Sequence, residues 1–242
     1  MKKMTQKYNL IKADSRGYAD HGWLKSSHSF SFANYYDPAR INFGALRVLN
    51  DDYVAAGEGF GKHPHDNMEI VSIPLSGELK HGDSMGNETV IKYGEVQAMS
   101  AGTGIIHSEM NNRQDIAVEF LQIWIIPEKK NVTPRYDQKP IDKLSTTNRL
   151  GQIVSPNSGE DGIWINQQAW FHLGFFDKKS FVKYDLKRTG NGVYLFIIEG
   201  GAEVDGHRIE RRDAITVTDT ETLSISIDKD TKILVIEVPM TL

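Results

Sequence analysis

The hydrophobic positions of this chain fall into short segments that are rich in β-branched and aromatic residues. In residues 223–227, which read Leu-Ser-Ile-Ser-Ile, apolar and polar residues alternate. A period of two is typical of strands with one buried face. Further strands are predicted over residues 45–49, 69–75, 118–126, 164–167, 193–198 and 232–238. Because no long segment has the period of an amphipathic helix, the pattern predicts a mainly β protein.

Turn-forming residues separate these segments, as at Ser76-Gly77 and Asp205-Gly206. Many short strands at such spacing are typical of sandwiches and barrels. The order strand, glycine turn, hairpin and second turn in residues 68–95 recurs in residues 193–213, which indicates one barrel unit used twice. Residues 133–162 are rich in Pro, Asn, Ser, Asp and Gly, with a helical turn expected near 142–144. We therefore predict two domains, 1–135 and 136–242.

Composition and charge narrow the function classes. The 242 residues carry a net charge of −4, whereas nucleic-acid-binding proteins usually have a basic surface. The chain has no cysteine, so a metal ion would need nitrogen and oxygen ligands. The first residues lack the apolar run of a signal peptide, and no stretch reaches the roughly 18 apolar residues of a membrane span. We expect a cytoplasmic protein that binds neither nucleic acid directly nor a membrane.

Two pairs of residues have the spacing of ligands on neighbouring strands. His63 and His65 lie two apart, as do His107 and Glu109, so each pair leaves the same face of its strand. Cross-strand neighbours have Cβ atoms about 4.5–5.5 Å apart, which would let the four donors meet at one ion. Three imidazoles and one carboxylate can leave coordination positions open for a substrate. The spacing therefore predicts a catalytic centre for one divalent metal.

The surroundings of these pairs resemble the two motifs of the cupin superfamily. The first motif, G-x5-H-x-H-x3-E followed by a glycine, is matched by Gly57, His63, His65, Glu69 and Gly77, with one extra residue before the last glycine. The second, G-x2-H-x3-N, is matched by Gly104, His107 and Asn111, although the usual upstream proline is missing around Ser100–Gly102. The resemblance implies two tandem cupin barrels of the jelly-roll, or double-stranded β-helix, type.

A narrower resemblance is to the pirin family of bicupins. It extends over most of residues 16–138 and includes HGWLKSSHSFSFANYYDP, ALRVLNDD, GFGKHPHDNMEI, GDSMGN, MSAGTGIIHSE and TPRYDQ. The C-terminal half matches only in its strand pattern. Within the family, the chain is most similar to bacterial pirins with quercetin 2,3-dioxygenase activity.

The pirin resemblance implies a ligand set. In many cupins the glutamate of the first motif binds the metal, which would be Glu69, but in pirins the fourth ligand is the glutamate that matches Glu109. His63, His65, His107 and Glu109 are then the ligands. Glu69 is left as an acceptor that orients a ligating imidazole. The resemblance suggests Fe(II), while such ligands also admit Ni, Cu, Mn, Co or Zn.

Three functions remain as hypotheses. The first is an oxidoreductase of the quercetin 2,3-dioxygenase type, which cleaves a flavonol with dioxygen and uses Glu109 as the base. The second is a metal-dependent regulatory module of the pirin kind that binds a protein partner. The third is a cupin isomerase or epimerase acting on sugars. The substrate-binding residues are unknown from the sequence.

The remaining histidines are expected to be structural or exposed. His81 and His207 lie in predicted hairpins and are expected at the surface, and His172 lies in a predicted strand. His21 and His28 are expected to hold an aromatic N-terminal segment against the barrel. The C-terminal half has no histidine at the positions where the repeat places the two motifs, so no second metal site is expected there.

Overall fold

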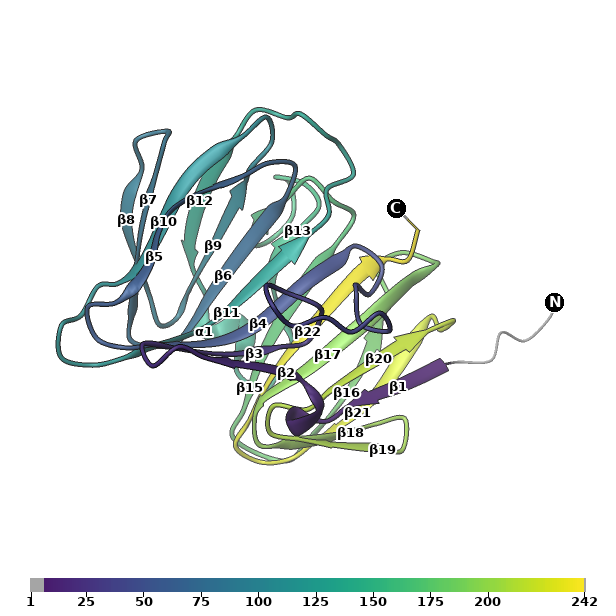
Figure 1. The fold of residues 1–242 in the computed structure, drawn as a ribbon. Coiled ribbons are helices and arrows are strands. Elements are labelled where there is room, and N and C mark those ends of the chain that lie inside the picture. The colour runs from purple at the N-terminus through teal and green to yellow at the C-terminus, as the bar shows by residue number, and fades with distance from the viewer. Residues whose placement is uncertain (1–6, 242) are drawn as a thin grey trace. The chain divides into compact units, whose positions relative to one another are not determined.

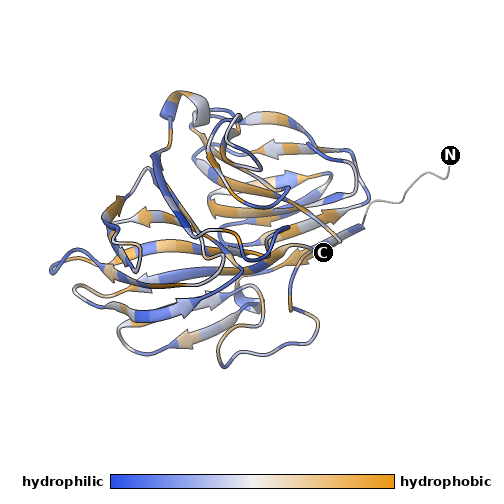
Figure 2. Cartoon of the chain, turned by 90° about the horizontal axis from the view of Figure 1, so that it is seen from above, coloured by the Kyte–Doolittle hydropathy of each residue, from blue (hydrophilic) through white to orange (hydrophobic). Residues whose placement is uncertain are grey.

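The computed structural model describes residues 7–241, and its regular secondary structure is almost entirely β-strand (Figure 1). The chain divides into two compact units. The N-terminal unit comprises Gly17–Ile141 and Ile163–Gln167, and the C-terminal unit comprises Asp142–Gly162, Gln168–Leu242 and the residues up to Arg16. Hydrophobic and hydrophilic residues alternate along several strands (Figure 2), as expected for strands with one buried face. The mainly β fold predicted from the sequence is confirmed.

The N-terminal unit contains two antiparallel sheets. The seven-stranded sheet has the order β12-β9-β6-β11-β4-β3-β2, and the four-stranded sheet has the order β5-β10-β7-β8. The strands of this unit are β2 (Gly17–Asp20), β3 (Leu24–His28), β4 (Leu46–Val54), β5 (Gly59–His65), β6 (Glu69–Ser76), β7 (Glu78–Asp83), β8 (Glu88–Lys92), β9 (Glu95–Ser100), β10 (Ile105–Asn111), β11 (Val118–Ile125), β12 (Arg135–Pro140) and β14 (Ile163–Trp164).

The two sheets of the N-terminal unit pack against each other through apolar side chains at one end. Leu79 and Ile91 of the four-stranded sheet form a buried cluster with Val54, Val118 and Phe120 of the seven-stranded sheet. Burying one such side chain contributes about 1.5–3 kcal/mol. The cluster therefore fixes how the inner faces of the two sheets meet, and the candidate site lies on these same faces.

The C-terminal unit repeats this arrangement. One sheet contains its strands in the order β1-β20-β17-β22-β15-β13, and the other has the order β16-β21-β18-β19. Its elements are β1 (Lys7–Ile11), the 3-10 helix η1 (Ala13–Ser15), α1 (Lys143–Thr146), β13 (Gly151–Ser155), β15 (Trp170–Phe176), β16 (Ser180–Asp185), β17 (Asn191–Glu199), β18 (Gly201–Val204), β19 (His207–Glu210), β20 (Ala214–Thr218), β21 (Thr222–Ile227) and β22 (Thr231–Pro239).

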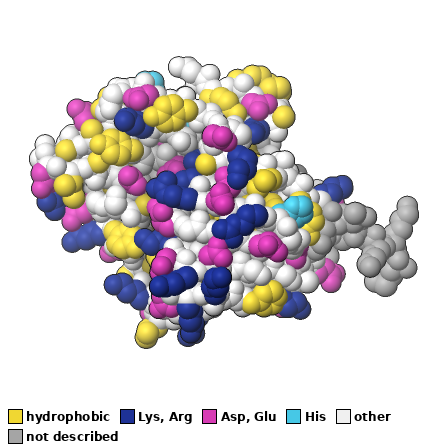
Figure 3. Space-filling view, turned by 90° about the horizontal axis from the view of Figure 1, so that it is seen from below, with side chains coloured by type: hydrophobic (Ala, Val, Ile, Leu, Met, Phe, Trp, Pro, Cys, Tyr) yellow, Lys and Arg dark blue, Asp and Glu magenta, His cyan; other side chains and the backbone are white. Residues whose placement is uncertain are grey.

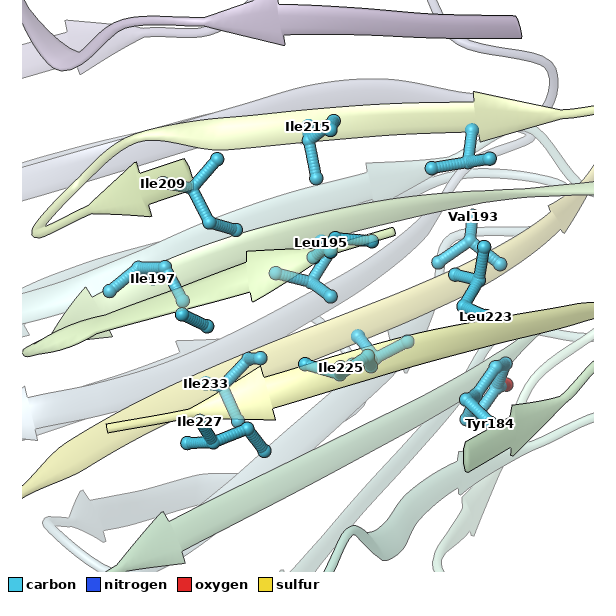
Figure 4. Close-up of a cluster of buried hydrophobic side chains, with 14 of the residues drawn as sticks. Tyr184, Val193, Leu195, Ile197, Ile209, Ile215, Leu223, Ile225, Ile227 and Ile233 are labelled. Atoms are coloured by element: carbon cyan, nitrogen blue, oxygen red, sulfur yellow. The ribbon is translucent and has the colours of Figure 1, made fainter. Parts of the chain in front are cut away.

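Aliphatic side chains fill the interior of the C-terminal unit (Figure 4). Leu195 and Ile197 of one sheet lie against Ile225 and Ile227 of the other, and all four side chains are buried. The alternation in residues 223–227 has this origin, because every second side chain of β21 points into the core. The C-terminal unit thus has an apolar interior at the level of this cluster.

The sequence did not indicate that the first strand belongs to the C-terminal unit. β1 pairs with β20, with Lys7 opposite Thr218. The loop after β1 is held by Asp213, which accepts hydrogen bonds from the backbone N–H of Ala13 at 2.8 Å and from the ammonium group of Lys12. Nothing in residues 7–11 specifies the partner strand, so the pairing of β1 with β20 could not be predicted from the sequence.

The connecting region is more regular than its composition suggests. Residues 133–162 contain β12, α1 and β13. The helical turn expected near 142–144 is present as α1, and the Asp142 side chain caps it by accepting a hydrogen bond from Leu144 N. The strand predicted over 164–167 is reduced to β14. The domain boundary between 135 and 136 stays a prediction.

Charged side chains of both signs are interspersed on the face of the molecule in Figure 3. This distribution agrees with the small net charge of −4. Among the described residues, no helix has both the length and the apolar character that crossing a bilayer would require.

Candidate metal centre

Strands β5 and β10 bring three histidines together, as expected from their spacing in the sequence. The strands are antiparallel neighbours in which His63 lies opposite His107 and His65 lies opposite Ile105. The ring centroids are 4.4 Å apart for His63 and His107, and 4.9 Å apart for His65 and either of the others. One ring nitrogen from each residue lies within 4.8 Å of the other two. Three imidazoles therefore converge on one point.

The hydrogen bonds of these rings leave nitrogen atoms available for a metal. His63 Nδ1 lies 2.7 Å from the carbonyl oxygen of Gly61 and donates to it, so the lone pair is on Nε2. Both ring nitrogens of His107 are buried and have no hydrogen-bond partner among residues 7–241. An unpaired buried polar atom costs about 1–3 kcal/mol. The three-histidine group, defined as His63, His65 and His107, thus fits a metal ion, which would engage a nitrogen that the protein leaves unpaired.

The environment of His65 and His107 keeps these two imidazoles neutral. Burial, with a smaller effect of the neighbouring histidines, lowers the pKa of His107 to about 2. Burial and the proximity of His63 lower the pKa of His65 to about 4. A metal binds the neutral imidazole, so no proton has to leave these two rings at neutral pH.

Glu109 lies on the same strand as His107 and is fully buried. Ser72 Oγ donates to its Oε1 and Gln122 Nε2 donates to its Oε2, each at 3.0 Å. Burial raises the pKa of Glu109, although these hydrogen bonds and the nearby His81 and His63 act in the opposite direction. The carboxyl group is not part of the three-histidine group, so its role as fourth ligand stays a prediction.

A row of polar side chains crosses the inner face of the seven-stranded sheet. Gln97, Ser72, Gln122 and Asn50 are consecutive cross-strand partners on β9, β6, β11 and β4, and all four are buried. The two central members hold Glu109 by one oxygen each. Through this row, the seven-stranded sheet orients a carboxyl group that belongs to the four-stranded sheet.

His81 was predicted at the surface, and this prediction is wrong. Its side chain is fully buried, with the ring centroid 5.5 Å from that of His107 and stacked on Tyr136 at 4.6 Å. The expectation rested on the polar residues of the β7–β8 hairpin. The alternation along β7 indicates the buried position correctly. Leu79, His81 and Asp83 share one face of the strand, and Leu79 is buried in the core.

Asp83 fixes the orientation of the His81 ring. Its carboxylate accepts a hydrogen bond from His81 Nε2 at 3.1 Å, and also from Met85 N, Asn87 N and Asn87 Nδ2 in the hairpin turn. Burial alone would raise the pKa of Asp83, but the hydrogen bonds from Asn87, His81 and Met85 hold it below its usual range. Because an ionised carboxylate only accepts, His81 carries its proton on Nε2.

Glu69 makes hydrogen bonds to a serine and an asparagine of its own unit. Its buried carboxyl group accepts hydrogen bonds from Ser100 Oγ at 2.7 Å and from Asn166 Nδ2 at 3.1 Å. Burial raises its pKa, against the effect of these hydrogen bonds. These contacts join β6, β9 and the short segment 163–167 within the N-terminal unit. A role for Glu69 in orienting a ligating imidazole stays a prediction.

The other histidines lie largely where the sequence placed them. His172 is in strand β15, and His207 is exposed beside the β18–β19 turn. His28 is buried against Phe32 and Tyr35, whereas His21 is exposed. Among residues 7–241, the group of three or more potential ligands with this geometry is His63, His65 and His107.

Two family models cover most of the chain. The model described as "Pirin" matches residues 11–125, and the model described as "Quercetinase C-terminal cupin domain" matches residues 152–238. Quercetin 2,3-dioxygenase of Escherichia coli K12 is 40% identical over 234 residues, which cover 95% of this chain and 98% of the relative. The chain belongs to the pirin family.

Other pirins support the same assignment. A pirin-like protein of Caulobacter vibrioides is 37% identical over 225 residues, or 93% of this chain and 96% of that protein. The crystal structure of the bacterial pirin YhhW from Escherichia coli in complex with nickel(II) has a TM-score of 0.91 and 37% identity, covering 96% of this chain and 99% of YhhW. The two tandem cupin domains predicted from the sequence are confirmed.

Proposed function

We propose that this pirin binds one divalent transition-metal ion on His63, His65, His107 and Glu109 and cleaves a flavonol such as quercetin with dioxygen. The observation that carries the proposal is the convergence of one imidazole nitrogen each from His63, His65 and His107. Among the described residues, neither ring nitrogen of His107 has a hydrogen-bond partner. Relatives named quercetin 2,3-dioxygenase support the substrate class. Iron, which the resemblance suggests, stays a prediction beside the nickel of YhhW.

A bound divalent metal would supply Lewis acidity and open coordination positions for the adjacent 3-hydroxyl and 4-keto oxygens of a flavonol. The protein side chains would hold the site in its geometry and accept a proton. His63 is oriented by its hydrogen bond to Gly61, and Glu109 is oriented by Ser72 and Gln122. We propose that a carboxylate oxygen of Glu109 accepts the proton of the 3-hydroxyl group.

Burial of Glu109 suits this proton transfer. In the metal-free protein, burial raises the pKa of the carboxyl group, so it holds a proton more readily than an exposed glutamate. Ser72 and Gln122 keep both of its oxygens oriented while the proton moves. The outcome implied by the family, opening of the central ring with loss of carbon monoxide, completes the proposed reaction. The cytoplasmic location stays a prediction.

The test combines elemental analysis of the purified protein with oxygen uptake on quercetin, before and after chelation. The expected result is one metal ion per chain and oxygen uptake that chelation abolishes and metal restores. His63→Ala should lose both metal and activity, whereas the exposed-site control His207→Ala should keep both. Metal-loaded protein that consumes no oxygen with flavonols would refute the dioxygenase proposal and leave the regulatory module as the function to test.

A further inference from the structure

The indole ring of Trp124 on β11 contacts both the three-histidine group and the aromatic N-terminal segment. It meets the His65 ring edge-to-face, with the ring centroids 4.8 Å apart and the planes at 82°. A second edge-to-face contact joins it to Phe32, at 5.4 Å and also 82°. This is a preferred geometry for aromatic pairs. Trp124 therefore connects a predicted metal ligand with a segment that the proposed function does not use.

The orientation of the His65 ring depends on ring contacts. A hydrogen bond to the carbonyl oxygen of Gly61 holds the His63 ring, whereas no hydrogen bond to the described residues holds the ring of His65. The torsion that turns an imidazole about its Cβ–Cγ bond has broad minima, so packing has to fix the angle of such a ring. Its ring neighbours are His63, His107 and Trp124. Of these three, only Trp124 is not itself a predicted ligand.

Apolar packing holds the indole of Trp124 in place. Its Nε1 is buried and has no hydrogen-bond partner among residues 7–241, although a buried tryptophan usually finds one. The ring packs against a cluster formed by Ile70, Met99, Ala101 and Ile105. The position of the indole is therefore set by its ring and not by its polar N–H group. A phenylalanine, which keeps a ring and lacks the N–H, should be able to replace it.

The N-terminal segment supports the indole through Phe32. The backbone N–H of Phe32 donates to Tyr35 O at 3.0 Å, and Tyr35 N donates to Phe32 O at 2.9 Å. His28 on β3 contacts the Phe32 ring edge-to-face at 5.3 Å. These contacts fix Phe32, which in turn limits the movement of Trp124. The aromatic motif in residues 21–38 thus reaches the predicted metal centre through one intervening ring.

We propose that Trp124, supported by Phe32, is a positioning residue for His65. It holds the imidazole at the angle at which one ring nitrogen meets the other two of the three-histidine group. The inference rests on the metal site of the proposed function, but not on its substrate or reaction. Outer partners of metal-binding histidines are commonly carboxylates, carbonyl oxygens or water. Here an aromatic ring takes that place, and without it the imidazole can rotate away although every ligand is still present.

The test measures nickel affinity by titration calorimetry on the metal-free protein, without a flavonol. Trp124→Leu keeps an apolar side chain but removes the ring contact, and it should weaken nickel binding about tenfold. Trp124→Phe restores a ring next to His65 and should bind nickel within about threefold of the wild type. Phe32→Leu acts only through Trp124, so it should cause a smaller loss of affinity than Trp124→Leu.

The matched control is Trp23→Leu. Trp23 makes the same kind of contact in the same unit, edge-to-face with Phe60 at 5.5 Å, and packs against an apolar cluster. Phe60 lies in β5, the strand that bears His63 and His65, but it is not a predicted ligand. We expect Trp23→Leu and Trp124→Leu both to lower the melting temperature of the metal-free protein. Only Trp124→Leu should also weaken nickel binding.

Wild-type nickel affinity in Trp124→Leu would overturn the proposal, as would equal losses of affinity in Trp124→Leu and Trp23→Leu. A loss in Trp124→Phe as large as that in Trp124→Leu would overturn it too, because the aromatic ring would then not be the cause. Should Trp124→Leu fail to fold, Phe32→Leu decides, since unchanged affinity in this variant contradicts the proposal and reduced affinity supports it.

Failure of the proposed function gives a different result. A wild type that binds nickel but consumes no oxygen with flavonols refutes the dioxygenase proposal alone, and the nickel affinities of the variants still decide the role of Trp124. A wild type that binds no nickel would overturn both proposals.

Discussion

His107 couples metal binding to stability at the level of a single residue. In the described part of the chain, neither of its two buried ring nitrogens has a hydrogen-bond partner. A metal bound there would therefore pair an unpaired atom and would not break an existing hydrogen bond. We expect metal at about 100 times its dissociation constant to stabilise the wild type by about 2.7 kcal/mol. His107→Ala should lose most of this gain.

Thermal unfolding with and without nickel measures this effect. The exposed residue His207 provides the matched control, because His207→Ala should leave the metal-induced rise in melting temperature unchanged. A variant His107→Ala that is stabilised as much as the wild type would show that the ion is held by other residues.

The buried carboxyl group of Asp52 should make the stability of the fold depend on pH. Burial raises the pKa of this carboxyl group to about 7, against the hydrogen bond from Ser26 and with smaller contributions from Asp51 and Glu109. The folded state therefore keeps a proton that the unfolded chain releases near pH 4, so stability falls as the pH rises from about 4 to 7. At pH 7 and above, the cost approaches about 4 kcal/mol.

Asp52→Asn should remove this cost, because the amide keeps an acceptor for Ser26 and cannot ionise. Denaturant unfolding of the metal-free protein should show a stability gain over wild type that is larger at pH 7 than at pH 4.5. The exposed residue Asp161 serves as control through Asp161→Asn, for which the difference should not depend on pH. A pH-independent effect of Asp52→Asn would contradict the buried carboxyl group as its source.

At the level of elements, two glycines of the C-terminal unit allow two free-energy costs to be told apart. One is the cost of a strained backbone conformation, and the other is the cost of a steric clash. Asp205 and Gly206 form the two-residue turn of the β18–β19 hairpin, with φ values of 46° and 88°. A Cβ at Gly206 would meet nothing within 4 Å. Gly200, with φ of 80°, precedes β18, and a Cβ there would collide with Thr231 Oγ1.

We expect Gly206→Ala to destabilise the C-terminal unit by about 1 kcal/mol, because only the left-handed backbone conformation is penalised. Gly200→Ala should cost clearly more, since it adds a clash to the same backbone penalty. Unfolding midpoints of the two variants in one denaturant series measure the difference. Equal midpoints would mean that the backbone around Thr231 shifts and relieves the clash, so that Gly200→Ala adds no steric cost.

The elements themselves could largely be predicted from the sequence, whereas their distant partners could not. The alternation in residues 223–227 and the Asp205-Gly206 turn are local signals, and both produced the expected structure. The polar row from Gln97 to Asn50 depends on the register of four strands that are not consecutive in the chain. His81 was wrongly predicted at the surface because its polar neighbours were given more weight than the alternation of side chains along β7.

The convergence of the three histidines could be predicted because His63 and His65 lie in one strand and His107 lies in its neighbour. An i, i+2 spacing fixes the face of both side chains, so only the pairing of β5 with β10 had to be inferred. The position of Asp52 beside Ser26 and the contacts of Glu69 with Asn166 involve residues 26 and 97 positions apart. Such contacts carry no local signature in a single sequence.

For the whole molecule, β1 links the beginning of the chain to the C-terminal unit. It covers the edge strand β20, and the loop after it is held by Asp213. Deleting residues 1–16 should lower the melting temperature of the C-terminal unit and expose an unpaired strand edge that promotes self-association. The stoichiometry of metal binding should remain that of the full chain, because the three-histidine group lies in the other unit.

Scanning calorimetry, size-exclusion chromatography and metal analysis of the deletion variant measure these three quantities. Lys12→Ala is the milder comparison, since it removes only the ammonium contact to Asp213 and keeps the backbone hydrogen bond of Ala13. A deletion variant that melts like the full chain would show that β1 does not contribute to the stability of the sheet.

The pairing of β1 with β20 also sets an order of events during synthesis. Ala13 and Asp213 are 200 residues apart, and at about 5–20 residues per second the ribosome needs roughly 10–40 s to deliver the second after the first. Residues 17–141, nearly all of the N-terminal unit, emerge within that interval. The nascent polypeptide therefore carries an unmatched leading strand while its histidine-bearing half has already left the exit tunnel.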